Sequence, residues 1–171
     1  TMRQIAGKAS KNIVIGYGEA AKSISGSSTS EGSENVGMGY AVFRNITTGS
    51  NNIALGYQGA YGLTSGSDNV IIGSKAGYAA PYIRNSVVIG TEAMSQGAAT
   101  SQFNTIMGYQ ANYKNLSNEG GNTIIGYQAG YWVGSGSGGL GGRENTLIGV
   151  KAGYNIGRGM RNICIGYNAG S

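Results

Sequence analysis

Histidine is absent from the sequence, which removes the side chain that most often serves as a general base or a metal ligand. The seven acidic residues are dispersed. Only Glu31 and Glu34 are close neighbours, whereas a glycosidase site needs two positioned carboxyl groups. The glycine-rich segments GYGEAA and GSGSGGLGG lack the Lys-Ser/Thr ending of a phosphate-binding loop. We therefore predict no catalytic residue, no cofactor and no metal site, and a protein that is not an enzyme.

Cysteine, proline and charge are also scarce. Cys164 is the only cysteine, so no intrachain disulfide can form, and the single proline, Pro81, excludes collagen and proline-rich tracts. Charged residues make up 11% of the chain, and its lysines and arginines are scattered rather than clustered as in a nucleic-acid-binding patch. No stretch is apolar enough to span a membrane. We expect no nucleic-acid partner and no membrane insertion, whereas the net charge of +5 leaves an anionic glycan partner open.

Glycine is abundant, at 33 residues, and it marks a repeat. The phrases NIVIGYGEA, NIALGYQGAY, NVIIGSKAGY, NTIMGYQAN, NTIIGYQAGY, NTLIGVKAGY and NICIGYNAGS are variants of one motif. The unit is about 17 residues long, and two copies are six residues longer. Aligned copies share the glycine that ends a short apolar run, at Gly16, Gly39, Gly56, Gly73, Gly90, Gly108, Gly126, Gly149 and Gly166.

The aligned columns predict a β-solenoid. The residue three before the glycine is β-branched in every copy, which favours a strand of three or four residues closed by the glycine. A second short strand is expected through the x-Ala-x-Tyr segment that follows. Two short strands and two turns form one coil, which is too small to bury its own apolar side and must stack on its neighbours. We predict about nine such coils in one domain over residues 1–171, with loop insertions at about 22–34 and 131–144.

Stacked coils place identical side chains above one another at about 4.8 Å. The residue four before the glycine is asparagine in eight copies, and its amide can bond to the asparagine of the next coil. We therefore predict a structural ladder formed by Asn12, Asn35, Asn52, Asn69, Asn104, Asn122, Asn145 and Asn162.

Both faces of the predicted strand are apolar. Positions three and one before the glycine lie on one face, position two lies on the other, and all three are mostly apolar. A strand of this kind is normally covered on both sides, and the sequence offers no helix as a cover. One face can fill the coil, and we expect the other to be covered by further copies of the chain in a symmetric oligomer.

The motif N-x-[VI]-[IL]-G-Y-x-A resembles the repeat of YadA-like heads of trimeric autotransporter adhesins, and NTxIGYxAG arrays of this type also occur in phage tail fibres. The resemblance covers nearly the whole chain. It implies an all-β, left-handed parallel β-roll, a homotrimer with a shared core, and adhesion to a cell surface. The unit is longer here than in adhesin heads. Their collagen-binding motif has its nearest match in NSVVIG at 85–90, which occurs once, so collagen binding is not carried over.

These features predict an extracellular segment, on a cell surface or a virion fibre, that binds a glycan or a surface protein as a homotrimer. A purely structural shaft, an ice-binding solenoid and a glycan-cleaving tailspike are the alternatives. Loops that leave a regular scaffold tend to carry binding residues. The second insertion therefore supplies the candidate ligand-binding residues Trp132, Tyr131 and Arg143. Two tyrosine columns, one and five residues after the glycine, are expected to be structural, with a binding stripe as the alternative.

Overall fold

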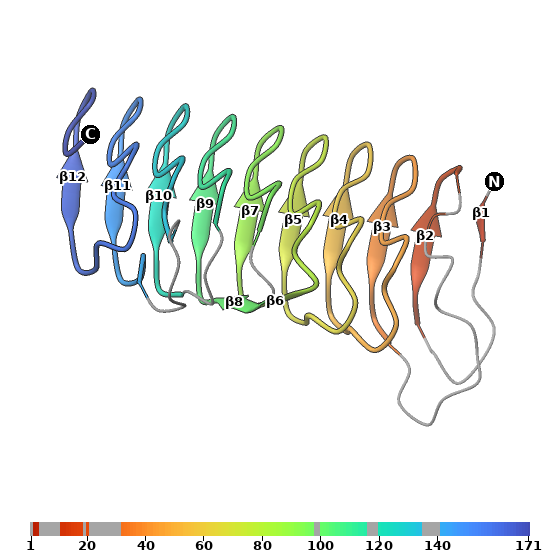
Figure 1. Ribbon diagram of the computed structural model, residues 1–171. Coiled ribbons are helices and arrows are strands. Elements are labelled where there is room, and N and C mark those ends of the chain that lie inside the picture. The colour runs from red at the N-terminus through yellow and green to blue at the C-terminus, as the bar shows by residue number, and fades with distance from the viewer. Residues whose placement is uncertain are drawn as a thin grey trace.

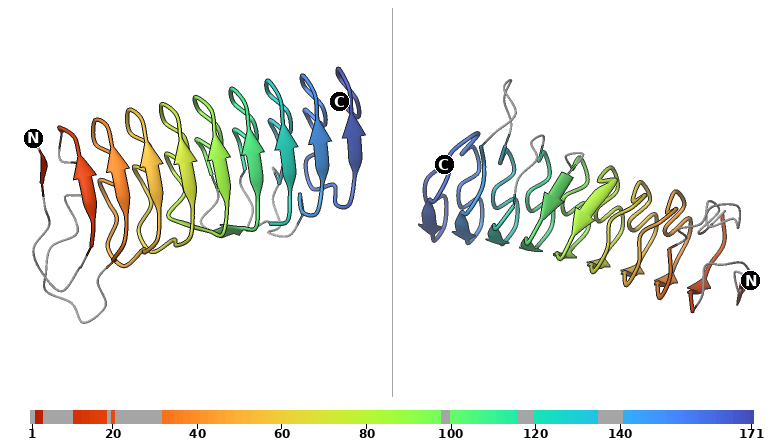
Figure 2. Two further views of the ribbon diagram at one scale, coloured as in Figure 1. Left: turned by 180° about the vertical axis from the view of Figure 1, so that it is seen from behind. Right: turned by 90° about the horizontal axis from the view of Figure 1, so that it is seen from below.

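The computed structural model describes residues 2–3, 11–18, 20, 32–97, 100–115, 120–134 and 141–171. Within these ranges the chain is all-β, has no helix, and forms a parallel β-solenoid, as predicted (Figure 1). The solenoid has about seven turns, where the sequence predicted about nine coils. The coils stack along one axis, and the two ends of the chain lie at opposite ends of the rod (Figures 1 and 2).

One strand from each coil contributes to a ten-stranded sheet, here called the main sheet. Its strands, in order along the rod, are β1 (Met2–Arg3), β2 (Ile13–Ile15), β3 (Val36–Met38), β4 (Ile53–Leu55), β5 (Val70–Ile72), β7 (Val87–Ile89), β9 (Thr105–Met107), β10 (Thr123–Ile125), β11 (Thr146–Ile148) and β12 (Ile163–Ile165). β1 pairs antiparallel with β2, and every later pair is parallel and keeps the columns in register, as in Thr105, Thr123 and Thr146. A second, two-stranded sheet pairs β6 (Tyr82–Arg84) with β8 (Thr100–Gln102).

The middle residue of each main-sheet strand from β2 to β12 points into the coil. Ile71, Ile124 and Leu147 are fully buried there, together with large side chains from the rest of the coil such as Phe43 and Met94. The column also contains Cys164. Cys164 is only half-buried, because no further coil of the described chain stacks on β12.

The predicted second strand, through the x-Ala-x-Tyr segment, is wrong. After each repeat glycine the chain forms a turn in which alternate residues are left-handed, as shown by φ values of 54° at Gln58 and 49° at Ala60. This zigzag directs alternate N–H groups to opposite neighbours. The N–H of Gln58 donates to the carbonyl of Tyr40 in the preceding coil at 2.7 Å, and the N–H of Ala60 donates to Ala76 in the following coil at 2.9 Å. The backbone is therefore hydrogen-bonded between coils without being extended. Its two-residue period matches that of a strand, which explains the error.

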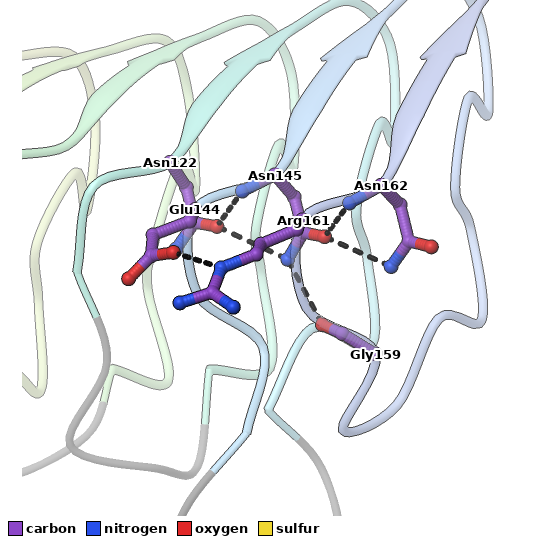
Figure 3. Close-up of polar contacts among 6 residues, drawn as sticks. All are labelled: Asn122, Glu144, Asn145, Gly159, Arg161 and Asn162. Carbon is purple, nitrogen blue, oxygen red and sulfur yellow. Dashed lines mark hydrogen bonds and ion pairs between the residues drawn. The ribbon is translucent and has the colours of Figure 1, made fainter.

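Asparagine side chains connect the coils beside the main sheet. The Oδ1 atom of Asn122 accepts hydrogen bonds from the backbone N–H and the side-chain amide of Asn145, at 3.0 and 3.2 Å. Asn145 accepts the same pair from Asn162, at 2.9 and 3.0 Å, and its own amide donates to the carbonyl of Gly159 (Figure 3). Ser86 interrupts the column, and its Oγ accepts only the N–H of Asn104. These buried bonds fix the register of one coil on the next.

Candidate functional site

The outer face of the main sheet carries a broad apolar surface. The first and third residues of each strand from β2 to β12 and the residue after each repeat glycine point away from the coil interior, and none of them is charged. We call this surface the apolar face. It consists of Ile13, Ile15, Tyr17, Val36, Met38, Tyr40, Ile53, Leu55, Tyr57, Val70, Ile72, Ser74, Val87, Ile89, Thr91, Thr105, Met107, Tyr109, Thr123, Ile125, Tyr127, Thr146, Ile148, Val150, Ile163, Ile165 and Tyr167.

Many of these side chains are well exposed, as at Ile13 (53%), Met38 (52%) and Tyr57 (49%). Tyr40 and Tyr57 stack on each other with ring centroids 5.1 Å apart, and Tyr109 and Tyr127 stack at 5.6 Å, whereas Tyr17 is tilted against Tyr40. The apolar face has three columns of side chains, two residues apart along the chain, and successive coils are spaced at about 4.8 Å. Together they cover roughly 500 Å². A continuous apolar patch of this size on a monomer usually marks an interaction surface.

The second tyrosine column, five residues after the repeat glycine, includes Tyr131. The ring of Tyr131 stacks between the rings of Tyr113 and Tyr154, with centroid distances of 5.1 and 5.2 Å. Burial is the main cause that raises the pKa of Tyr131, and the electrostatic effect of the nearby tyrosines adds to it. Both faces of this ring are covered, so Tyr131 packs as part of the scaffold.

Trp132 is half-buried next to this column. Its ring meets Tyr131 edge-on at 5.7 Å, and the ammonium group of Lys114 lies 4.1 Å from the ring centroid. One face of the indole is therefore already occupied by a cation–π contact.

Arg143 lines a different feature, a hollow of about 470 Å³ that includes neither Trp132 nor Tyr131. We call this hollow the notch. Its base is the backbone of Gly120 and Gly121. The side chains in its lining that are available to contact a ligand are Tyr82, Arg84, Gln102, Phe103, Arg143 and Glu144.

The notch exists because one coil lacks two side chains. Gly120 and Gly121 occupy the columns six and five before the repeat glycine, where the neighbouring coils carry Gln102 with Phe103 and Arg143 with Glu144. The backbone continues across the gap. The N–H of Gly121 donates to Gln102 and the N–H of Glu144 donates to Gly120, both at 3.1 Å. The result is a gap between two walls of side chains.

The second sheet forms one wall. In β6 and β8 the middle residues, Ile83 and Ser101, are buried, so Tyr82, Arg84 and Gln102 face outward. Figure 1 places these strands beside the start of β7 and β9. Phe103 follows β8 and is 61% exposed, in a column that is otherwise polar or charged apart from Gly121.

Glu144 and Arg143 form the other wall. The Nε of Arg161 donates to Oε2 of Glu144 at 2.6 Å, from the next coil along the rod (Figure 3). This hydrogen bond and the charge of Arg161 lower the pKa of Glu144, and Arg143 adds to the effect. The carboxylate therefore stays ionised and is held in place by Arg161.

The sequence-based candidates included Arg143 and missed the other residues of the notch. The sequence feature that indicates these residues is a departure from the repeat columns, not a motif. Gly120 and Gly121 stand where other copies carry side chains, and Phe103 stands in a polar column. The other predicted insertion cannot be compared in this way, since its residues 22–31 lie outside the described ranges, as do 135–140 of the second insertion.

Comparisons of the chain with protein-family models, with curated proteins and with solved structures find no match. In the described ranges there is no helix of the length and apolarity needed to cross a membrane.

Proposed function

We propose that this chain is a non-enzymatic segment of an extracellular fibre or adhesin head, on a cell surface or a virion, that works as a homotrimer of left-handed nine-coil rods and binds a cell-surface glycan or protein. The apolar face carries this proposal. Water contact with uncharged Ile, Val, Met and Tyr columns along the whole rod is unfavourable, and burial against copies of the same face removes it.

A rotation axis parallel to the rod suits this surface. Each coil then meets the equivalent coil of its neighbours, and every repeat adds the same contact. The number three comes from the resemblance of the repeat to trimeric adhesin heads and tail fibres. Such a fibre leaves the sides away from the axis, with their loops and the notch, for contact with a receptor.

Ice binding is a second candidate, favoured by one observation. Thr105, Thr123 and Thr146 lie in register on the apolar face, and the adjacent column of Met107, Ile125 and Ile148 is equally regular. The threonines occupy only three neighbouring strands. A thermal-hysteresis assay tests this candidate, and freezing-point depression without self-association supports it over the fibre.

Solution mass, measured by light scattering, tests the trimer. We expect the protein to have three times the chain mass of 17.5 kDa. Replacing both Met38 and Met107 with glutamate is expected to yield monomers, because symmetry brings the introduced carboxylates together, and like charges in an interface cost several kcal/mol.

The matched control places two glutamates away from the apolar face, as Thr48→Glu with Asn155→Glu, at exposed positions in turns. This control is expected to remain trimeric, and circular dichroism should show the same β structure in both variants. A wild-type protein that stays monomeric at high concentration would overturn the proposed assembly.

A further inference from the structure

We propose that the notch binds a carboxylated sugar residue of an acidic polysaccharide. This inference rests on the proposed receptor-binding function and specifies the chemical class of its ligand. It concerns a site formed within one chain.

The size of the notch suits one or two sugar rings. Its volume is about 470 Å³, and the coils that carry Gln102 and Arg143 are two spacings apart, about 9.6 Å. Pockets for small ligands start at roughly 300 Å³. The walls are side chains and the base is backbone, so a sugar ring can enter between Phe103 and Arg143 and rest over Gly121.

Aromatic rings are available on one side. Phe103 is 61% exposed and Tyr82 is 42% exposed, although neighbouring positions in their columns carry polar side chains or glycine. An exposed phenyl ring packs well on the C–H face of a sugar, and a tyrosine adds a hydroxyl at its edge. This contact would bury apolar surface that the monomer leaves in water.

Unpaired positive charge is available on both sides. Arg84 and Arg143 lie in the same column, with Gln102 and Gly120 between them. In the described part of the chain neither guanidinium forms a hydrogen bond or an ion pair. Glu144 already has Arg161 as its partner, so Arg143 is left to bind a carboxylate, for which the guanidinium has matching two-pronged geometry. The Glu144 carboxylate can accept hydrogen bonds from sugar hydroxyls.

The backbone around the notch disfavours a polypeptide ligand. An extended peptide binds best by adding a strand to an open edge. Here the N–H groups of Phe103, Gly121 and Glu144 already donate to Arg84, Gln102 and Gly120 in the preceding coils. These N–H groups are therefore not available to an added strand, whereas the exposed side chains of the notch can recognise a ring that carries hydroxyl and carboxylate groups.

Gly121→Asn is the decisive variant, because it fills the notch without straining the fold. Asn51 and Asn85 occupy the same column with φ values of 58° and 49°, close to the 72° of Gly121. A Cβ at Gly121 would lie 3.5 Å from Cγ of Glu144, an ordinary contact. We expect the variant to unfold like the wild type and to bind an acidic sugar at least 10-fold more weakly.

The probes are trigalacturonate, trimannuronate and sialyllactose, each paired with its carboxyl-reduced neutral form, in isothermal titration calorimetry. At least one acidic probe should bind at least 10-fold more tightly than its neutral form. Arg143→Gln should remove this preference. Lys75→Gln, which loses the same charge in a column where Gln58 already stands, should leave it unchanged.

Absence of any acid preference, or wild-type binding by Gly121→Asn, would overturn the inference. Stronger binding of an acidic peptide through the same residues would instead assign the notch to a protein receptor. Light scattering on the same samples separates the two proposals. A trimer that binds none of the acidic sugars contradicts this inference alone, and a monomer that binds one through the notch contradicts the trimer alone.

Discussion

Gly126→Ala is expected to prevent the solenoid from forming. A Cβ at this position would lie 2.3 Å from the carbonyl oxygen of Gly149 in the next coil and 2.7 Å from its carbonyl carbon. Both atoms belong to backbone that the stacking itself holds in place, so neither can move aside. The left-handed φ of 139° adds a penalty of about 1–2 kcal/mol. We expect loss of the cooperative unfolding transition followed by circular dichroism.

Gly166→Ala is the matched control. Gly166 belongs to the same column and has a similar φ of 120°, but a Cβ there would meet no atom within 4 Å. This variant carries the backbone strain without the clash, and we expect it to fold with a free energy of unfolding lowered by about 1–2 kcal/mol. Equal damage in the two variants would show that strain, rather than close contact between coils, explains the glycine column.

The sequence predicted the stacking because its period is nearly constant. A repeat of about 17 residues with fixed asparagine and glycine columns has few solutions other than coils in register, and the structure has that register throughout β2 to β12. The sequence did not reveal which apolar face lies inside. The interior column contains residues as different in size as Gly37 and Leu147. Within each coil, other side chains compensate for this difference in volume. A Cβ on Gly37 would lie 2.9 Å from the ring of Phe43, which fills the space that the glycine leaves.

The sequence was less informative about the notch, the proposed binding site. The notch arises from absent side chains at Gly120 and Gly121, and its walls come from three different coils. Residues separated by about 40 positions, such as Phe103 and Arg143, become neighbours only after stacking is known. The lone tryptophan was a natural candidate for a ligand platform, yet its environment is the tyrosine column and Lys114.

Asn122→Ala is expected to destabilise the protein by about 2–6 kcal/mol, because each of the two buried polar groups left unpaired, the backbone N–H of Asn145 and the carbonyl of Gly142, costs about 1–3 kcal/mol. Asn122 is 1% exposed. Its Oδ1 accepts the backbone N–H and the side-chain amide of Asn145, and its own amide donates to the carbonyl of Gly142 at 2.8 Å. Alanine satisfies none of these groups. Urea unfolding at one fixed protein concentration measures the loss.

Asn122→Ser separates the hydrogen bonds from simple loss of volume. Ser86 stands in this column, and its Oγ accepts the N–H of Asn104 at 3.1 Å. A serine at position 122 should likewise accept the N–H of Asn145 and restore about half of the stability that alanine loses. Hydrogen exchange of the backbone N–H of Asn145 provides a local check. Its protection should fall in the alanine variant and persist in the serine variant. An alanine variant within 1 kcal/mol of the wild type would mean that apolar packing alone holds the coils in register, since one lost bond is itself worth about that much.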